Sequence, residues 1–307
     1  MELKWTQAEP STPGLSVRLA DEGRVLISID SSPVLIGKVA RDWAEAHLLY
    51  PRAATNLDIL PPWTASECRD LGHDTERWFH SIRSRLQASD RNPLHPGEWV
   101  LTSHPYPWQP AAFHEHAATW LREEVVEPVA STDGAFTAVI DFFSQFPGSA
   151  SALIPLRPLS GRDSPRVKAH RRRVREGSLA PVVLLRVSGL GGHVILDGHD
   201  RLVAAIAEQQ VPVFACLSRT DSAEFNKISG RAVSDYEATM AAIAEAELHS
   251  GGRVLGSAQQ QAEASRHLAR QLDGTHSSPT RTWPLSIDEW EVSARKTSQA
   301  WLSNLEN

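Results

Sequence analysis

The run VILDGHDRLVAAIAEQQVPVFACL, residues 194–217, constrains the fold more than any other part of the chain because the spacing of its apolar residues changes along it. It begins as an apolar strand, passes through the polar turn DGHDR at 197–201, and continues with a helical pattern over 202–209. The segment APVVLLRV just before it is continuously apolar, which is typical of a strand in a sheet covered on both faces. The chain must therefore accommodate a cluster of charged residues where a buried strand meets a helix.

The elements around this turn predict a compact unit over residues 152–220. LIPLRPL predicts a short first strand, and Ser164 followed by Pro165 is typical of a helix start. The basic helix PRVKAHRRRVREG then ends at Gly177, a usual C-terminal stop. The resulting order is strand, helix, strand, turn, strand, turn, helix and strand, with VPVFACL as the last strand. We therefore predict a small mixed-sheet domain and an α+β fold class.

The N-terminal region, residues 1–147, predicts a mixed α+β region of no family that we can name. Two alternating segments at 15–19 and 24–30 predict a β-hairpin. The segment 32–50 starts with a serine N-cap followed by a proline, and its apolar residues recur at helical spacing, so it predicts a helix. PGSAS, residues 147–151, predicts the boundary with the next domain.

Further elements of this region have local signals of different strength. Thr64 and Glu67 form a capping box that predicts a helix, with a break near Gly72 and a resumption through TERWFHSIRSRLQAS. The proline-rich stretch that follows predicts a loop with one short strand at EWVL. Residues 109–126 predict another helix, whereas GAFTAVIDFFSQF fits a strand and a helix equally well.

The C-terminal region, residues 221–307, predicts a helical tail. S-x-x-E patterns at 234–237 and 286–289 fit capping boxes, and SAQQQAEASRHLARQL between them predicts a polar helix.

Composition limits the classes of protein that this chain can belong to. The formal net charge of −6 argues against a dedicated nucleic-acid binder, which usually has a basic excess. Cys68 and Cys216 are the only cysteines, so neither a disulfide framework nor a cysteine zinc cluster is expected. The N-terminal stretch lacks the apolar core of a signal peptide, and no window approaches the roughly 18 apolar residues of a membrane span. We therefore expect a cytoplasmic protein with no membrane partner.

The DGHDR turn has residues that suit anion binding. A helix start behind Gly198 exposes unpaired backbone N–H groups, and Arg201 in the first turn could clamp a phosphate. Asp197 could hold Mg²⁺ or act as a base, and His199 could donate to phosphate or shuttle a proton. The alternative is a well-capped helix start, in which Asp200 only favours the helix dipole. A carboxylate at position 200 would also repel an anion unless a cation offsets it.

The ordered pattern over Ala152–Leu217, from LIPLRPL through APVVLLRV and LDGHDR to VPVFACL, resembles the ParB/sulfiredoxin superfamily domain. Members of this superfamily bind CTP or ATP with the phosphates against the turn and its helix start. The resemblance therefore implies a bound nucleotide, with Gly198, His199 and Arg201 as phosphate contacts. It also implies that Arg157 and Arg162, which follow the first strand, meet the ligand.

Differences between this sequence and the known members of the superfamily limit which of their activities can be expected here. Sulfiredoxins need a cysteine where this chain has His199, so sulfinic-acid reduction is not expected. The D-G-H-H-R turn of the free serine kinases is the most similar, although Asp200 replaces its second histidine. Those kinases also have a glutamate base near the first strand, and only Asp163 could substitute for it here.

These observations predict a nucleotide-dependent small-molecule phosphotransferase that uses ATP or ADP, or CTP, together with Mg²⁺. Its catalytic residues would be Asp197, His199 and Asp163, with Asp197 as the metal ligand. One alternative is a non-catalytic ParB-like regulatory protein that binds a nucleotide or DNA through the basic helix 166–175. Another is a non-phosphoryl enzyme that uses His199 and Asp197 as acid and base. His114 and His116, two residues apart on a predicted helix, are poorly spaced for one metal.

Overall fold

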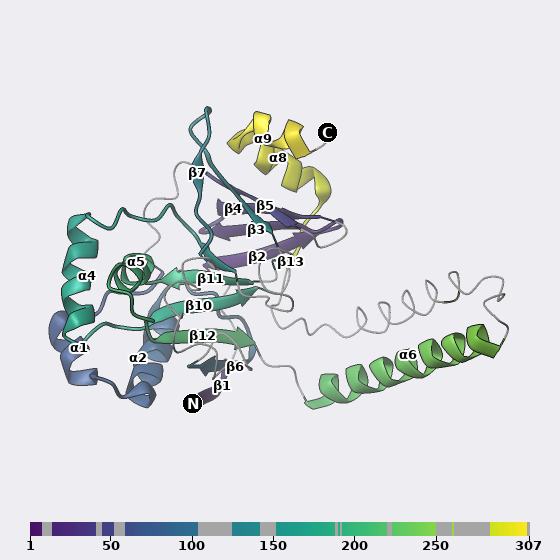
Figure 1. Cartoon of the computed structure of the whole chain (residues 1–307), viewed down its shortest axis with the longest axis horizontal. Coiled ribbons are helices and arrows are strands. Elements are labelled where there is room, and N and C mark those ends of the chain that lie inside the picture. Colours follow the sequence, from purple (N-terminus) through teal and green to yellow (C-terminus); the bar gives the residue numbers. More distant parts are fainter. Residues whose placement is uncertain are drawn as a thin grey trace. The chain divides into compact units, whose positions relative to one another are not determined.

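The computed structural model of the chain describes residues 1–7, 14–40, 45–51, 59–103, 125–141, 152–187, 190, 192–219, 223–249, 260 and 283–305. Within these residues two β-sheets combine with helices, which confirms the mixed α+β class (Figure 1). The chain divides into two compact units, one formed by 1–219 with 282–307 and the other by 220–281.

The strands and helices have the following bounds. The strands are β1 (Glu2–Gln7), β2 (Leu15–Ala20), β3 (Arg24–Ile29), β4 (Ser32–Val39), β5 (Glu45–Tyr50), β6 (Gly97–Thr102), β7 (Val129–Ala130), β8 (Phe136–Asp141), β9 (Leu153–Pro155), β10 (Val182–Val187), β11 (Gly192–Asp197), β12 (Phe214–Arg219) and β13 (Trp283–Pro284). The helices are α1 (Ala65–Leu71), α2 (Thr75–Ala88), α4 (Pro165–Arg175), α5 (His199–Ala207), α6 (Ala223–His249), α8 (Ile287–Thr297) and α9 (Gln299–Leu305).

The first sheet has the strand order β1-β6-β12-β10-β11-β9. All four strands expected over 153–217 occur in it: β10 pairs antiparallel with β11 and parallel with β12, while β11 pairs parallel with β9. The sheet continues into the N-terminal region, because β12 pairs antiparallel with β6 and β6 with β1. It therefore crosses the boundary expected at 147–151, whose residues lie outside the described part of the chain.

The second sheet has the order β13-β2-β3-β4-β5-β8-β7 and shows where the sequence prediction succeeded and failed. The hairpin expected at 15–30 is confirmed as β2 and β3. The helix expected at 32–50 is wrong, since 32–39 form β4 and 45–50 form β5, which pair antiparallel. The sheet has apolar residues buried on both of its faces, so β4 carries the consecutive buried residues 34–36 instead of an alternating pattern. Such a run cannot be told from a buried helix by periodicity alone.

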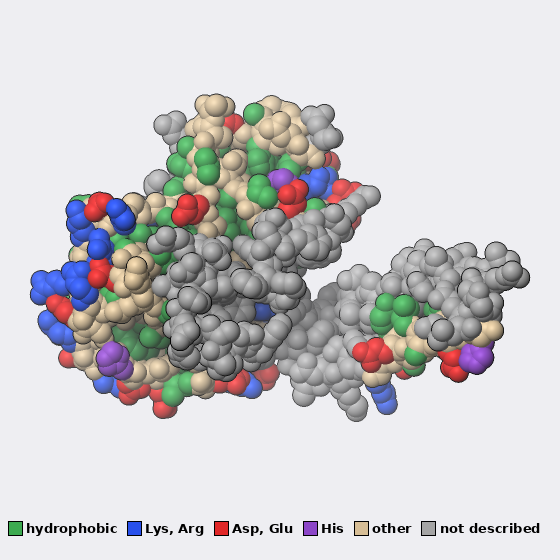
Figure 2. All heavy atoms as spheres, in the orientation of Figure 1, with side chains coloured by type: hydrophobic (Ala, Val, Ile, Leu, Met, Phe, Trp, Pro, Cys, Tyr) green, Lys and Arg blue, Asp and Glu red, His purple; other side chains and the backbone are tan. Residues whose placement is uncertain are grey.

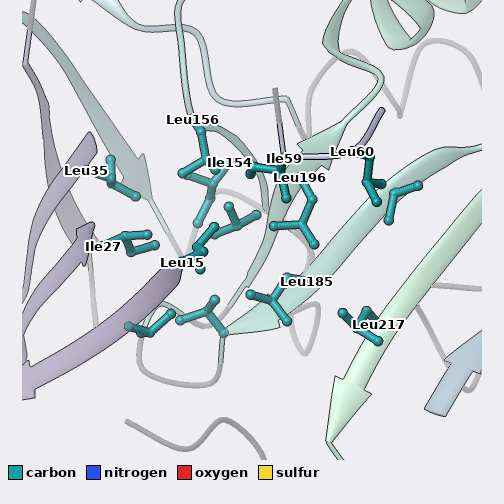
Figure 3. Close-up of a cluster of buried hydrophobic side chains, with 14 of the residues drawn as sticks. Leu15, Ile27, Leu35, Ile59, Leu60, Ile154, Leu156, Leu185, Leu196 and Leu217 are labelled. Carbon is teal, nitrogen blue, oxygen red and sulfur yellow. The ribbon is translucent and has the colours of Figure 1, made fainter. Parts of the chain in front are cut away.

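The main hydrophobic core includes side chains from both sheets and from α2. In Figure 3, labelled side chains from the second sheet, Leu15, Ile27 and Leu35, lie near Ile154, Leu185 and Leu196 from the first. A second cluster lies where α8 and α9 pack on the other face of the second sheet through Trp290 and Trp301. The Trp290 indole is 1% exposed and its Nε1 donates to the carbonyl of Val25 at 3.1 Å.

Two of the three expected capping boxes occur as helix starts. Thr64 and Glu67 cap α1, and Ser286 and Glu289 cap α8, each with both reciprocal hydrogen bonds. The capping box expected at 234–237 is wrong, because these residues lie inside the continuous helix α6. An S-x-x-E pattern cannot mark a helix start where the preceding residues are already helical.

Other expectations have mixed outcomes. The helix resumes after Gly72 as α2, EWVL lies in β6, and the ambiguous segment at 134–146 contains the strand β8. Of the helix expected at 109–126, only Val125 and Val126 are described, and Val125 forms a β-bridge with Leu153. The polar helix expected at 257–272, apart from position 260, lies outside the described residues, as do His114 and His116.

Two further findings concern the membrane and the cysteines. Among the helices of the described residues, none has the length and apolar character needed to span a membrane. Cys68 and Cys216 are both buried free thiols, and burial raises the pKa of each. A buried thiol with a raised pKa is a poor nucleophile at neutral pH.

Candidate phosphate site at the start of helix α5

The turn between β11 and α5 depends on a glycine. Gly198 is the N-cap of α5 and has a φ of 99°, a left-handed conformation that side chains rarely adopt. A Cβ at this position would lie 3.0 Å from the Arg201 guanidinium and 3.1 Å from the Cα of Val182. The helix therefore starts at His199, three residues before the start expected from the sequence, and its first backbone N–H groups have no side-chain cap.

Helix α4 packs beside α5 and brings basic side chains to the site. Val167 and Val174 of α4 form a buried cluster with Ala204 and Ala205 of α5, whose small side chains permit close helix packing. As expected, Ser164 is the N-cap of α4, and Pro165 is its first residue.

The C-terminal ends of these two helices are held together by an ion-pair cluster. Arg171 and Arg175 both contact the Glu208 carboxylate, at 2.6 and 2.9 Å. These contacts lower the pKa of Glu208, with the Arg171 hydrogen bond as the largest cause. Two arginines of the basic helix thus have a structural partner.

Arg201 is held inside the fold by three groups. Its Nη2 donates to the Asp197 carboxylate at 2.7 Å and to the carbonyl of Pro181 at 3.0 Å. Its guanidinium also lies 5.4 Å from the centre of the Trp63 ring, a cation–π contact. Since the Arg201 side chain is only 9% exposed, the structure places it as a structural link and not as an open phosphate clamp.

Trp63 joins the turn to the N-terminal region of the chain. Its indole Nε1 donates to Ser81 of α2 at 3.0 Å, and its ring meets Trp78 edge-on at 5.7 Å. The Arg85 guanidinium also lies over the same ring, at 4.8 Å. The residues preceding and within α2 therefore support the position of Arg201, a connection that no local pattern in the sequence indicates.

His199 connects α5 to the end of the first strand. Its Nε2 lies 3.1 Å from the backbone nitrogen of Leu156 and must accept this hydrogen bond, so the ring is neutral with its proton on Nδ1. Burial, with the nearby Arg157 charge as the next cause, lowers the pKa of His199 to about 3. This geometry does not support a proton shuttle at His199, because taking up a proton at Nε2 would break the contact with Leu156. It leaves Nδ1–H as a neutral donor.

Asp200 lies at the centre of a charged cluster. Its carboxylate is 3.1 Å from Nη2 of Arg157 and 3.3 Å from Nε of Arg166, although its side chain is only 4% exposed. Burial alone would raise its pKa, but a hydrogen bond with Ser160 and the two arginines outweigh that effect and lower it. Asp200 is therefore ionised at neutral pH, and the two guanidiniums that face it come from different elements.

Arg162 and Asp163 lie on the exposed part of the same loop. The two side chains contact each other at 3.6 Å, and Lys168 of α4 reaches the other oxygen of Asp163 at 3.6 Å. Both loop side chains are more than 70% exposed, so they are open to solvent and to a ligand. Unlike Arg157, Arg162 has no contact with the buried turn among the described residues.

Positive charge gathers on the surface of α4. Residues 162–176 contain seven basic and two acidic side chains, whereas the whole chain has a net charge of −6. Figure 2 shows these Lys and Arg side chains together over the region that Figure 1 labels α4. The long side chains of Arg162, Arg166, Lys168 and Arg172 are at least 60% exposed.

Asp197 is not placed as a resident magnesium ligand. One of its oxygens already accepts from Arg201, so a full positive charge lies beside the carboxylate. Within the described residues, no group of three or more His, Cys, Asp or Glu side chains could hold a metal ion. These residues do not fit a bound Mg²⁺, and the proposal below uses no step through a metal held by Asp197.

Sequence reasoning thus found the turn but missed several of its partners. It did not identify Arg166, Ser160, Leu156 or Trp63, each of which contacts a residue of the turn. Arg166 had one usable signal, since it is the second residue of a helix whose start was correctly located. Comparison of the chain with protein-family models, with curated proteins and with solved structures found no match.

Proposed function

We propose that this chain binds a nucleotide through its phosphates at the start of α5 and transfers a phosphoryl group from it to a small molecule. One observation carries the binding part of the proposal: Arg157 and Arg166, from a loop and from α4, converge on the first turn of α5. The transfer part rests on the resemblance to the kinases of the ParB/sulfiredoxin superfamily.

The electrostatics of the cluster favour a phosphate. Two guanidiniums face the single carboxylate of Asp200, which leaves an excess positive charge at this position. The N-terminus of α5 adds a partial positive charge and backbone N–H groups without a side-chain cap. Guanidinium groups and helix N-termini are both common phosphate ligands in proteins. His199 could add a neutral hydrogen bond through Nδ1–H.

For the transfer step, Asp163 is the base candidate that the geometry leaves. Asp197 is held at 2.7 Å by the buried guanidinium of Arg201, and His199 accepts a backbone hydrogen bond. The contacts of Asp163 with Arg162 and Lys168 are longer, at 3.6 Å, and lie on the exposed surface. Asp163 is 72% exposed and lies in the loop between Arg157 and Arg166. It would take the proton of an acceptor hydroxyl as the oxygen attacks the terminal phosphate.

The binding test compares two arginines on the same helix. Isothermal titration with ATP, ADP and CTP should give a measurable Kd for the wild type, and Arg166→Gln should weaken it about tenfold or more. Arg172→Gln is the matched control, because Arg172 is equally exposed on α4 but pairs with Glu176. Arg201→Ala is a poor test, since Arg201 is buried and its loss would disturb the fold. No binding of any nucleotide by the wild type would refute the proposal.

Transfer is tested separately with Asp163→Asn. If Asp163 is the base, this variant should keep its nucleotide affinity and lose turnover, measured as ADP formation during a screen of small hydroxyl and amine acceptors. Unchanged turnover in this variant would remove Asp163 from the mechanism.

The exposed cations of α4 favour a second candidate, binding of a nucleic-acid backbone. Lys168 and Arg172 lie one helical turn apart, so a strand of phosphates could contact both. Fluorescence anisotropy with a labelled duplex at about 50 and about 200 mM salt tests it, since phosphate contacts make binding strongly salt-dependent. A Lys168→Gln, Arg172→Gln double variant should lose this binding. Arg171 is less suitable, because it pairs with Glu208.

A further inference from the structure

The contacts of Asp200 resemble those of a bound ligand. Its buried carboxylate meets one guanidinium with each oxygen, at 3.1 Å for Arg157 and 3.3 Å for Arg166. It also hydrogen-bonds with the side chain of Ser160 and lies in the first turn of α5. Guanidinium pairs, a hydroxyl and a helix start are the groups that would hold an oxyanion arriving from solution.

We infer that Asp200 is a resident counter-ion on the phosphate-binding arginines, so that the site selects ligands with a doubly charged phosphoryl group over singly charged anions. This inference rests on the proposed function. A ligand phosphate would compete with Asp200 for the positive charge of Arg157 and Arg166, because both guanidiniums already face its carboxylate. A ligand carboxylate would bring no more charge than Asp200 has, and its binding would lose translational freedom. A phosphate dianion brings a second charge to a cluster with two cations.

The two arginines differ in how easily they can change partner. The Arg166 side chain is 78% exposed, so its guanidinium can turn from Asp200 to a ligand while α4 stays in place. Arg157 is 19% exposed and also donates to the carbonyl of Pro158 at 3.2 Å. Exchange would therefore take place at Arg166, with Arg157 remaining on Asp200.

A competing explanation predicts the opposite change in phosphate affinity when Asp200 is removed. If Asp200 only orders the two arginines for the ligand, its removal should weaken phosphate binding. If Asp200 competes with the ligand, its removal should strengthen binding, by about tenfold for one unit charge several ångströms away at a partly shielded site. The direction of the change therefore decides between the two roles.

The experiment uses Asp200→Asn in the full chain, with inorganic phosphate and acetate as probes in chloride buffer of constant ionic strength. We expect phosphate to bind about tenfold tighter to the variant than to the wild type. We also expect acetate to bind the variant measurably and the wild type not at all. Equal or weaker phosphate binding by the variant would overturn the inference. Adding Arg166→Gln to the variant should abolish the gain, and a gain that survives would also overturn the inference.

Folding of the variant provides a second readout. If circular dichroism shows that Asp200→Asn is unfolded in chloride buffer, phosphate should restore its fold, because the ligand replaces the missing counter-ion. Failure of phosphate to restore it would overturn the inference.

The outcomes also separate this inference from the proposed function. A wild type that binds nucleotides, with a variant that gains nothing, refutes only the role of Asp200. A wild type and a variant that bind neither phosphate nor nucleotide refute the proposed function itself.

Discussion

Replacing His199 with glutamine tests whether a buried neutral histidine connects α5 to the end of β9. The His199 ring is 4% exposed, and its Nε2 accepts from the Leu156 backbone N–H at 3.1 Å. Burial, followed by the charge of Arg157, lowers the pKa of His199 from 6.5 to about 3. A glutamine amide oxygen can accept the same hydrogen bond without titrating, so His199→Gln separates protonation from the loss of the contact.

The expected magnitude follows from linkage between protonation and folding. The folded pKa lies below the unfolded value, so the unfolded chain takes up the proton first and stability falls as the pH decreases through 6.5. Between about pH 7.5 and about pH 5.5, this difference removes about 1.4 kcal/mol of folding free energy. The size of this loss depends only on the pKa of His199 in the unfolded chain, because a folded pKa of about 3 keeps the ring neutral at both pH values.

The assay is urea denaturation of the wild type and the variant at these two pH values. We expect the fall in unfolding free energy to be about 1.4 kcal/mol smaller in His199→Gln. Side-chain carboxyl groups, with ordinary pKa values near 4, titrate mainly below the range, so they contribute little to the difference.

A second variant, His199→Phe, keeps the ring shape but leaves the Leu156 N–H without its acceptor. Relative to His199→Gln, it should lose about 1–3 kcal/mol at both pH values, and it should show the same reduced pH dependence as that variant. An equal fall in the wild type and in His199→Gln would refute the reasoning.

Three other substitutions have expected effects on stability, each measured by urea denaturation at neutral pH. Gly198→Ala should lose about 1–3 kcal/mol, because a φ of 99° is strained for alanine and its Cβ would lie only 3.1 Å from the Cα of Val182, and a wild-type value would contradict the left-handed turn. Trp290→Ala should lose about 3–5 kcal/mol, since the 1% exposed indole joins α8 to the second sheet, and a small loss would show that α8 contributes little. Tyr50→Phe should gain about 1 kcal/mol, because the buried hydroxyl has no partner among the described residues, and a loss would reveal a partner.

The strands and helices over 152–219 were predictable because their signals are local. The N-cap and proline that start α4, the glycine that follows it and the glycine of the turn each act within a few residues. The strand β10 has buried residues on both faces of its sheet, and its continuously apolar sequence indicated this environment correctly.

A similar apolar segment at 32–50 led to the wrong prediction of a helix, and the reason lies in the tertiary structure. Strand β4 is also buried on both faces, on one side in the main core and on the other by α8 and α9. The covering helices come from residues more than 240 positions later in the chain. Without them, Ser32 and Pro33 resemble a helix start, whereas in the structure they pair with β3 next to a register shift. No window of the sequence contains that information.

The contacts of the candidate site also divide into those made within the DGHDR turn and those made by residues far from it in the sequence. This division changes the role that the turn can have in binding. The Asp197–Arg201 pair is local, and it cancels the charge of both residues inside the fold. His199 is also used internally, by the Leu156 backbone. The turn itself therefore supplies almost no net charge to a ligand, apart from the negative charge of Asp200.

The positive charge comes from Arg157 and Arg166, which precede the turn by more than 30 residues and reach it only because β9 pairs with β11 and α4 packs on α5. Any phosphate recognition at this site must then depend on the balance between these two arginines and Asp200. A change at Asp200 should consequently alter ligand affinity more than a comparable change at Arg201, whose loss acts mainly on folding.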